Sequence, residues 1–188
     1  MRARLASRNE GKLRELRRSL SGWEIDALGV DDYPPEVGET YYENARAKAV
    51  FGRSADDSEA WILGEDSGLE VVGLDGAPGV TSARFAGGEH VQRLLAALEG
   101  MDGERRRARY VCELVALSPD GVERRGTGIL EGVIGVEARG SGGFGFDPVF
   151  LPDGHTRTVA ELGDEWKGAN SHRARAARAL LEVLPRDP

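Results

Sequence analysis

Residues 110–128 read YVCELVALSPDGVERRGTG, which is two extended stretches, 110–117 and 122–128, on either side of the turn-forming sequence Ser-Pro-Asp-Gly. This pattern predicts a hairpin of two antiparallel strands. Outside it, short apolar stretches alternate with leucines at helical spacing. We expect strands at 2–7, 23–28 and 61–63, extended runs at 69–72 and 129–138, and helices at 11–21, 40–54, 91–99 and 171–184. Thr40 and Glu43 match a capping box at the start of the second helix. Helices interleaved with strands, together with an antiparallel hairpin, predict an α/β domain with a mixed β-sheet.

The composition is typical of a globular protein of 188 residues, with 40% hydrophobic residues, 30% charged residues and a mean hydropathy of -0.40. This length allows one good core, or two small lobes around one. No apolar run approaches the roughly 20 residues of a membrane helix, and the N-terminus lacks the apolar core of a signal peptide. We therefore expect a cytoplasmic protein with no membrane partner.

Charge and cysteine content exclude several functional classes. The net charge of -7 and the pI of about 5.1 argue against a general nucleic-acid binder, and the excess acid suits a divalent metal. The single cysteine, Cys112, excludes a disulfide framework and a cysteine-rich zinc site. It lies in an apolar stretch, so we expect a buried and inert thiol.

The chain contains three lysines and twenty-two arginines, and each lysine lies beside glycine, asparagine or acidic residues. Lys12, Lys48 and Lys167 can each place a compact ammonium against a single phosphate oxygen, which the planar guanidinium of arginine does less well. This pattern predicts a phosphate-rich ligand. The alternative is that each lysine lies on a solvated helix face.

Residues 7–12 lie where the first predicted strand passes into a helix, a junction whose unpaired N–H groups and helix dipole favour phosphate binding. The segment comprises Ser7, Arg8, Asn9, Glu10, Gly11 and Lys12. It is not a Walker loop, since Ala6 stands where the first glycine belongs. An ordinary helix cap made by Asn9 explains the segment equally well.

Two adjacent carboxylates, Glu65 and Asp66, follow the predicted strand at 61–63, and Ser67-Gly68 predicts a turn that aims Asp66 inward. Adjacent carboxylates repel each other unless a cation compensates. Glu36 and Glu43 could complete an oxygen-rich shell for Mg²⁺, which also takes waters and substrate phosphates as ligands. The alternative is a solvated acidic turn.

A glycine-rich segment, 140–145, has the spelling G-x-G-x-x-G, but Asp147-Pro148 follows where a dinucleotide site needs a helix. We interpret it as a loop that places Phe144 over a base; the alternative is a core position for Phe144. Lys167, just before the last predicted helix, forms with His172 and Arg173 a cluster suited to an anion or a purine. The simpler alternative is a helix cap at Ser171 with an exposed Arg173.

Six motifs in order, SRNEGKLREL, GETYYENARAKA, EDSGLEV, GAPGVTSARFAG, GGFGFDPVF and KGANSHRARA, resemble the inosine triphosphate pyrophosphatase family over nearly the whole chain. The resemblance implies one domain over 1–188, with a mixed, elongated sheet flanked by helices and two lobes around a central active-site cleft. It implies a homodimer that sanitises the nucleotide pool. The reaction would be Mg²⁺-dependent hydrolysis of ITP, dITP, XTP and dXTP to the monophosphate and pyrophosphate.

The resemblance also implies residue roles. Asp66 would bind Mg²⁺ and accept a proton from the attacking water, with Glu36 and Glu65 as candidate further metal ligands. Lys12 and Lys48 would act in catalysis, and residues 7–12 would bind the triphosphate. The remaining substrate contacts would come from Ser67, from the base loop of Phe144, Gly145, Phe146 and Asp147, and from Lys167, His172 and Arg173 at the 6-oxo edge. Arg84 would support the cleft.

Three residues depart from the usual family pattern: Arg8 for a small residue, Glu65 for Asp, and Phe146 for Tyr. Two other functions remain open. One is a nucleotide-binding module without catalysis. The other is a serine hydrolase using Ser67 and His172, although Glu65 stands where the first glycine of G-x-S-x-G belongs.

Overall fold

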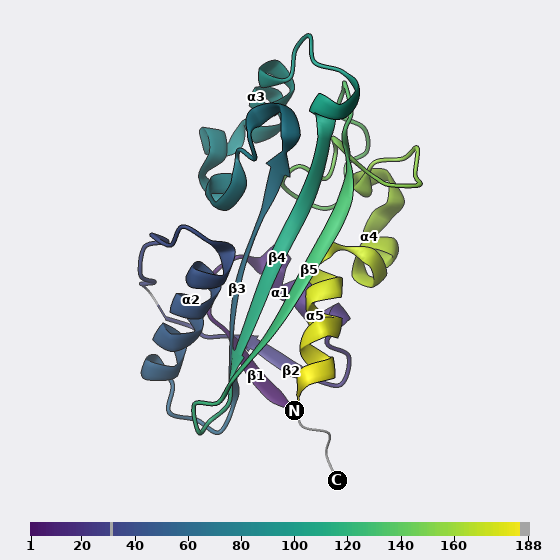
Figure 1. Cartoon of the computed structure of the whole chain (residues 1–188). Helices are drawn as coiled ribbons and strands as arrows, with labels where there is room; N and C mark the ends of the chain where they lie inside the picture. Colours follow the sequence, from purple (N-terminus) through teal and green to yellow (C-terminus); the bar gives the residue numbers. More distant parts are fainter. Residues whose placement is uncertain (31, 185–188) are drawn as a thin grey trace. The chain divides into compact units, whose positions relative to one another are not determined.

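The computed structural model describes residues 1–30 and 32–184, except the side chains of 86–88. These residues form a six-stranded sheet with the order β2-β1-β3-β4-β5-β6, accompanied by α-helices (Figure 1). The strands are β1 (Arg2–Leu5), β2 (Glu24–Ala27), β3 (Trp61–Val71), β4 (Arg107–Leu117), β5 (Glu123–Ile134) and β6 (Phe150–Pro152). The helices are α1 (Glu10–Ser19), α2 (Tyr41–Ala55), α3 (His90–Ala97), α4 (Val159–Asn170) and α5 (His172–Val183), with 3-10 turns η1 (Val72–Leu74), η2 (Gly79–Gly88) and η3 (Gly103–Arg106).

The sheet is mixed, as predicted. β1 pairs in parallel with both β2 and β3, whereas β5 and β6 are antiparallel. The parallel pairs reflect the helices that interrupt the first part of the chain. The α/β class inferred from the sequence is therefore confirmed.

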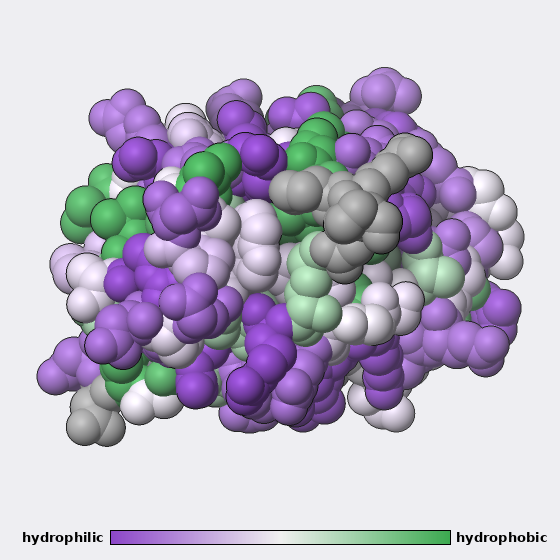
Figure 2. Space-filling view, turned by 90° about the horizontal axis from the view of Figure 1, so that it is seen from below, coloured by the Kyte–Doolittle hydropathy of each residue, from purple (hydrophilic) through white to green (hydrophobic). Residues whose placement is uncertain are grey.

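The surface carries few large hydrophobic side chains. The face seen in Figure 2 is covered mainly by hydrophilic residues, and its hydrophobic residues lie in small separate groups. Within the described residues, no helix combines the length and the apolar character needed to cross a bilayer.

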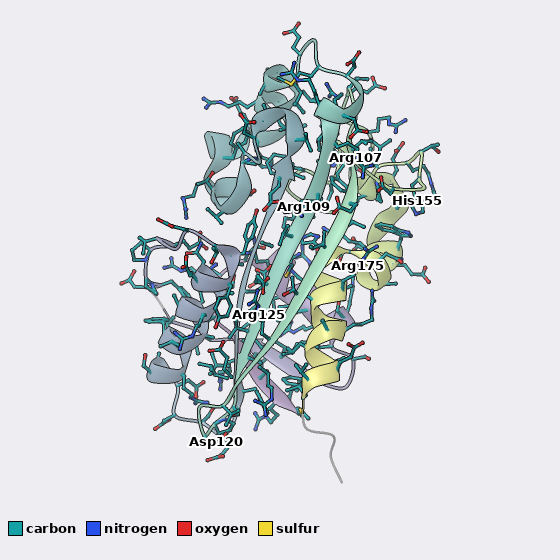
Figure 3. The ribbon with its side chains drawn as sticks, in the orientation of Figure 1. Arg107, Arg109, Asp120, Arg125, His155 and Arg175 are labelled. Atoms are coloured by element: carbon teal, nitrogen blue, oxygen red, sulfur yellow. The ribbon has the colours of Figure 1, made fainter. Side chains whose placement is uncertain are left out.

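The predicted hairpin is present, and its strands are longer than expected. β4 and β5 are neighbours joined by a turn in which the Ser118 N–H donates to Val122 O at 3.0 Å. Asp120 lies at this turn, and its carboxylate accepts a hydrogen bond from the Ser118 hydroxyl (Figure 3). β5 continues to Ile134, so the separate extended run predicted at 129–138 is largely part of the hairpin.

The described chain divides into two compact units, in agreement with the two lobes predicted. Of the described residues, the first unit comprises 1–30, 32–66, 112–128 and 172–184, and the second comprises 67–111 and 129–171. β3, β4 and β5 each contribute residues to both units.

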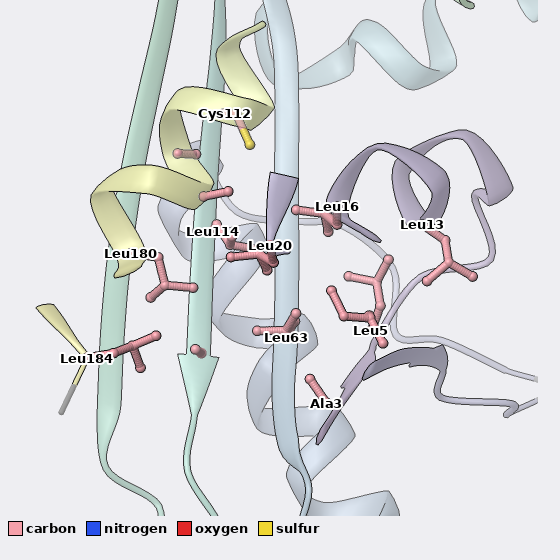
Figure 4. Packing of buried hydrophobic residues seen from close by; sticks show 14 residues of the cluster. Ala3, Leu5, Leu13, Leu16, Leu20, Leu63, Cys112, Leu114, Leu180 and Leu184 are labelled. Carbon is pink, nitrogen blue, oxygen red and sulfur yellow. The ribbon is translucent and has the colours of Figure 1, made fainter. Parts of the chain in front are cut away.

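The first unit has hydrophobic clusters on both sides of β3. Leu63 belongs to a cluster with Leu16 of α1 and Leu180 of α5 (Figure 4). Ile62 belongs to another cluster, with Ala45 and other residues of α2. Because successive side chains of a strand point to opposite faces, β3 is covered on both sides. Truncating a buried leucine of this kind costs about 2–5 kcal/mol of stability.

The second unit has its own hydrophobic core. Leu69 of β3 and Leu94 of α3 pack there with Phe146 and Phe150. The helix predicted at 91–99 corresponds to α3.

One helix of the second unit, α4, was not predicted. Its start is a capping box: Thr158 Oγ1 accepts from the Glu161 N–H, and the Glu161 carboxylate accepts from the Thr158 N–H. The spacing of threonine and glutamate at 158 and 161 is the sequence signal that could have revealed it. Lys167 therefore lies within a helix rather than just before one.

Candidate functional site

Asp66 of β3 is the centre of a buried polar cluster in the first unit. Its Oδ1 lies 3.0 Å from Lys48 Nζ, and its Oδ2 accepts a hydrogen bond from Asn44 Nδ2 at 3.2 Å. The same Lys48 ammonium lies 2.5 Å from Glu36 Oε1 and donates to the backbone oxygen of Glu65 at 3.0 Å. The carboxylates of Glu36 and Asp66 thus converge on one cationic group.

Burial shapes the protonation of this cluster. It raises the pKa of Asp66 above its usual 3.8, and the charges of Lys48 and Lys12 offset this effect only in part. For Lys48, burial lowers the pKa, but the nearby carboxylates, led by Asp66, outweigh it and leave the pKa raised. A buried carboxyl with a raised pKa beside a specific charged partner is typical of functional sites.

The local structure of α2 presents Asn44 and Lys48 to Asp66. They lie four residues apart, and therefore on one side of the helix. The predicted capping box is confirmed: Thr40 Oγ1 accepts from the Glu43 N–H at 3.1 Å, and Glu43 accepts from the Thr40 N–H at 3.0 Å. Glu43 thus caps the helix, and we do not place it in a metal shell.

Close contact between α2 and β3 depends on Gly64. A Cβ at position 64 would lie 2.0 Å from the backbone oxygen of Ala45. Glycine is therefore required where α2 crosses β3, immediately before the two carboxylates.

Glu65 belongs to a different buried network, formed with α1 and α5. Its Oε1 accepts from Arg173 Nη2 at 2.8 Å and from Cys112 Sγ at 3.4 Å, and its Oε2 lies 2.6 Å from Lys12 Nζ. Arg173 also lies 2.5 Å from Glu15 Oε2. Burial alone would raise the pKa of Glu65, but Arg173 and Lys12 outweigh it and hold this pKa well below its usual value. Cys112 is fully buried, as predicted, and burial raises its pKa.

The prediction of a turn at Ser67-Gly68 is wrong. β3 runs without interruption from Trp61 to Val71. Serine, aspartate and glycine favour turns locally, but packing on both faces of the strand overrides that preference. The repulsion expected between Glu65 and Asp66 is offset because each carboxylate meets its own cations, although the charge of Glu65 still adds to the raised pKa of Asp66.

The segment between β1 and α1 forms a helix cap. Asn9 Oδ1 accepts from the Lys12 N–H at 3.1 Å, and the Asn9 N–H donates to Ser7 Oγ at 3.2 Å. The cap interpretation of Asn9 is therefore confirmed, while phosphate binding by the segment stays a prediction. Arg8 is exposed, with its guanidinium 5.4 Å from the centre of the Tyr33 ring.

A second polar cluster lies in the second unit around Asp147. Its Oδ2 lies 2.5 Å from Lys167 Nζ and accepts from the Phe144 N–H at 2.8 Å. The Lys167 ammonium lies 4.3 Å from the centre of the Phe144 ring, and the Tyr110 hydroxyl donates to Asp147 Oδ1 at 3.4 Å. Phe144, Asp147 and Lys167 are thus brought together. A Cβ on Gly143 would lie 2.1 Å from Asp147 Oδ2, so glycine is required there.

Phe146 packs inside the same unit, with 4% of its surface exposed. Its ring centre lies 6.1 Å from that of Phe85 and 5.3 Å from that of His90. Phe146 thus supports the loop that carries Phe144 and Asp147 from within.

The remaining predicted residues are dispersed over several elements. Ser67 is half-buried in β3, His172 is the buried first residue of α5, and Arg84 is exposed in η2. Lys167 belongs to the second unit, whereas His172 and Arg173 belong to the first.

Sequence reasoning missed three residues of these clusters: Asn44, Glu15 and Tyr110. Asn44 precedes Lys48 by one helical turn, and Glu15 follows Lys12 by three residues, so helical spacing could have found both. Tyr110 had no local signal, because its partner Asp147 is distant in sequence.

This chain is similar to known proteins over nearly its whole length. The family model described as the Ham1 family matches residues 3–183. A relative from Gloeobacter violaceus, named dITP/XTP pyrophosphatase, is 45% identical over 186 residues, covering 97% of this chain and 93% of the relative.

Solved structures are also similar to this chain over nearly its whole length. The Ham1 protein of Staphylococcus aureus has a TM-score of 0.83 with 32% identity, covering 97% of both chains. A nucleoside-triphosphatase, or dITP/XTP pyrophosphatase, from Mycobacterium abscessus has a TM-score of 0.73 with 39% identity, covering 98% of both chains.

Proposed function

Because the chain belongs to the Ham1 family, we propose that it hydrolyses dITP, ITP, XTP and dXTP to the nucleoside monophosphate and pyrophosphate. The family expected from the six sequence motifs is confirmed, and the relatives named dITP/XTP pyrophosphatase support this substrate class. The structural observation that carries the proposal is the convergence of Glu36 and Asp66 on the Lys48 ammonium.

We propose Mg²⁺ as the cofactor, held by Asp66 and Glu36. Two carboxylates that already meet at one cation are a suitable start for a Mg²⁺ site, since this ion takes oxygen ligands. Among the residues that the structure describes, no group of three or more His, Cys, Asp or Glu side chains could hold a metal. Bound there, Mg²⁺ would neutralise negative charge that develops on the phosphate oxygens.

Glu36 is a better candidate than Glu65 for the second carboxylate. Glu65 is fully buried and its oxygens already meet Arg173 and Lys12, whereas Glu36 shares the Lys48 ammonium with Asp66. We propose that Glu65 holds Lys12 and Arg173 in place.

In the proposed reaction, Asp66 accepts the proton of the water that attacks the α-phosphorus. Its raised pKa suits a proton acceptor better than that of an ordinary aspartate. Lys48 and Lys12 share the charge of the phosphate oxygens. Residues 7–12 bind the triphosphate through the N-terminal end of α1.

We propose that the second unit reads the base. Phe144 provides an aromatic face, Lys167 a donor for the 6-oxo oxygen, and Asp147 a fixed acceptor beside it. Adenine presents its own donor at this position and leaves the Lys167 donor unmatched, which costs about 1–3 kcal/mol. The guanidinium of Arg173 is held by Glu65 and Glu15, so we assign direct recognition to Lys167. Base contacts by His172 and Arg173 remain predictions from the resemblance.

A screen for pyrophosphate release tests the proposal. The substrates are ITP, dITP, XTP, ATP and GTP, each with Mg²⁺ and with EDTA. We expect turnover of the first three with Mg²⁺ and none after chelation. A serine hydrolase using Ser67 and His172 would be indifferent to EDTA, and a binding module would release no pyrophosphate. Equal rates on ITP and ATP would overturn the proposed specificity.

The family resemblance further leads us to propose that the protein is cytoplasmic and forms a homodimer. Each chain would act as one catalytic domain. Sedimentation at several protein concentrations tests the oligomeric state.

A further inference from the structure

Asn44 joins two segments that carry the proposed metal ligands. Its side chain is buried, with 2% of the residue exposed. Asn44 Oδ1 accepts from the Gly38 N–H at 2.8 Å, and Nδ2 donates to Gly38 O at 3.4 Å and to Asp66 Oδ2 at 3.2 Å. One carboxamide therefore connects α2, the loop before it and β3.

These contacts exceed what the start of α2 requires. The helix is already capped by Thr40 and Glu43. The carboxamide is suited to the task because it combines an acceptor for an N–H with two donors, for a carbonyl and a carboxylate. The contact with the loop is tight, since a Cβ at Gly38 would lie 2.7 Å from Asn44 Oδ1.

The contacts form a closed ring. Two residues before Gly38, Glu36 reaches the Lys48 ammonium, which also meets Asp66 Oδ1. Asp66 is thus held at one oxygen by Asn44 and at the other by Lys48. Asn44 also fixes the backbone close to Glu36, and so both carboxylates are tied to one helix.

We propose that Asn44 is a positioning residue that sets the spacing of the Glu36 and Asp66 carboxylates for the divalent metal. This inference rests on the proposed function of those two residues. Its consequence is specific: loss of the carboxamide weakens metal binding more than it weakens the fold.

The test compares Asn44→Ala and Gly38→Ala with Ala47→Gly in the whole chain. Ala47 is an exposed position of α2, where glycine destabilises the helix by about 1 kcal/mol without removing a ring contact. Three quantities are measured for each protein: the Mg²⁺ concentration for half-maximal activity, the Kd for Mn²⁺ from electron paramagnetic resonance without substrate, and Tm. Mn²⁺ serves as the probe because it takes the same oxygen ligands as Mg²⁺.

We expect Asn44→Ala to raise both metal constants about tenfold or more, the effect of losing one hydrogen bond to a charged group. Gly38→Ala should act in the same direction, since it disturbs the ring from the loop side. Ala47→Gly should lower Tm and leave both metal constants unchanged.

The inference is overturned if Asn44→Ala and Gly38→Ala both have the same half-maximal Mg²⁺ concentration and the same Kd for Mn²⁺ as Ala47→Gly, whatever their Tm. It is also overturned if one of these two variants is too unstable to assay and the other leaves metal binding unchanged. Failure of the proposed function has a separate sign: the unmodified protein would then release no pyrophosphate or would be indifferent to EDTA.

Discussion

Glu65 and Asp66 are adjacent in β3, yet their carboxylates meet different cations on opposite sides of the strand. Glu65 contacts Lys12 of α1 and Arg173 of α5, whereas Asp66 contacts Lys48 of α2. Strand geometry produces this division, because successive side chains point to opposite faces. Glu65 is neutralised by Lys12 and Arg173, whereas Asp66 pairs with Lys48 and accepts a hydrogen bond from Asn44. Substitutions at the two positions should therefore have different effects.

Replacing Asp66 by Asn should abolish most turnover while preserving the fold. The amide cannot accept the proton of the attacking water, so we expect kcat to fall by about 10²- to 10⁴-fold. Pyrophosphate release with ITP and saturating Mg²⁺ measures the loss, and circular dichroism checks the fold. Asp120→Asn, at the exposed hairpin turn, is the control and should retain full activity. Retained turnover in Asp66→Asn would contradict the assigned role.

Replacing Glu65 by Gln should reduce stability strongly at neutral pH. The substitution removes the buried counter-charge of Lys12 and one carboxylate partner of Arg173, which keeps its contact with Glu15. We expect the loss to cost about 3–5 kcal/mol. Urea unfolding at pH 7 measures the change. Glu70→Gln, which removes a more exposed pair with Arg109, should cost less than about 1 kcal/mol.

The effect of Glu65→Gln should depend on pH. The pKa of Glu65 is lower in the folded chain than its usual 4.5. Its contribution to stability is therefore fully present above pH 4.5 and is lost as the pH falls toward the lowered folded pKa. Unfolding curves between pH 7 and pH 3 should show the difference between the two proteins shrinking below pH 4.5. A difference that stays constant with pH would contradict an ionised Glu65.

Lys48 should not be replaceable by arginine. Its ammonium lies close to Glu36, Asp66 and a backbone oxygen, a geometry that a planar guanidinium cannot reproduce. We expect kcat/KM to fall about 10²-fold in both Lys48→Arg and Lys48→Met. Arg46→Met, on an exposed part of the same helix, is the matched control. Full activity in Lys48→Arg would show that only the positive charge matters.

Lys167→Met should change base selection more than catalysis. We expect kcat/KM for ITP to fall about 10- to 100-fold, with a much smaller change for ATP, because only the 6-oxo base accepts from the ammonium. The ratio of the two values is the quantity to measure. Glu165→Gln, on an exposed position of α4, provides the control. An equal loss for both nucleotides would indicate a role in folding rather than in recognition.

Local signals predicted the elements that depend on neighbouring residues. The capping box of α2 and the hairpin at 110–128 were visible because their contacts lie within a few residues. The helix α4 was not predicted, although the spacing of Thr158 and Glu161 is a local signal of the same kind.

The continuity of β3 through Ser67-Gly68 was not predictable in the same way. The strand is buried on either side of this point against elements distant in sequence: Leu63 packs in the cluster with α1 and α5, and Leu69 packs in the cluster with α3. The candidate site likewise has one part that the sequence predicted and another part that depends on tertiary packing. Asp66, Lys48 and Glu36 were identified and meet in the structure, whereas the separation of Glu65 from them required knowing which face each side chain occupies.

The carboxylate pairing of all three lysines has a practical consequence for handling the protein. The side chains of Lys12, Lys48 and Lys167 expose only 11%, 12% and 5% of their surface. Amine-reactive dyes and crosslinkers need an accessible, uncharged amine, so they should react only slowly with these three lysines while the chain is folded. Unfolding the chain should make all three reactive.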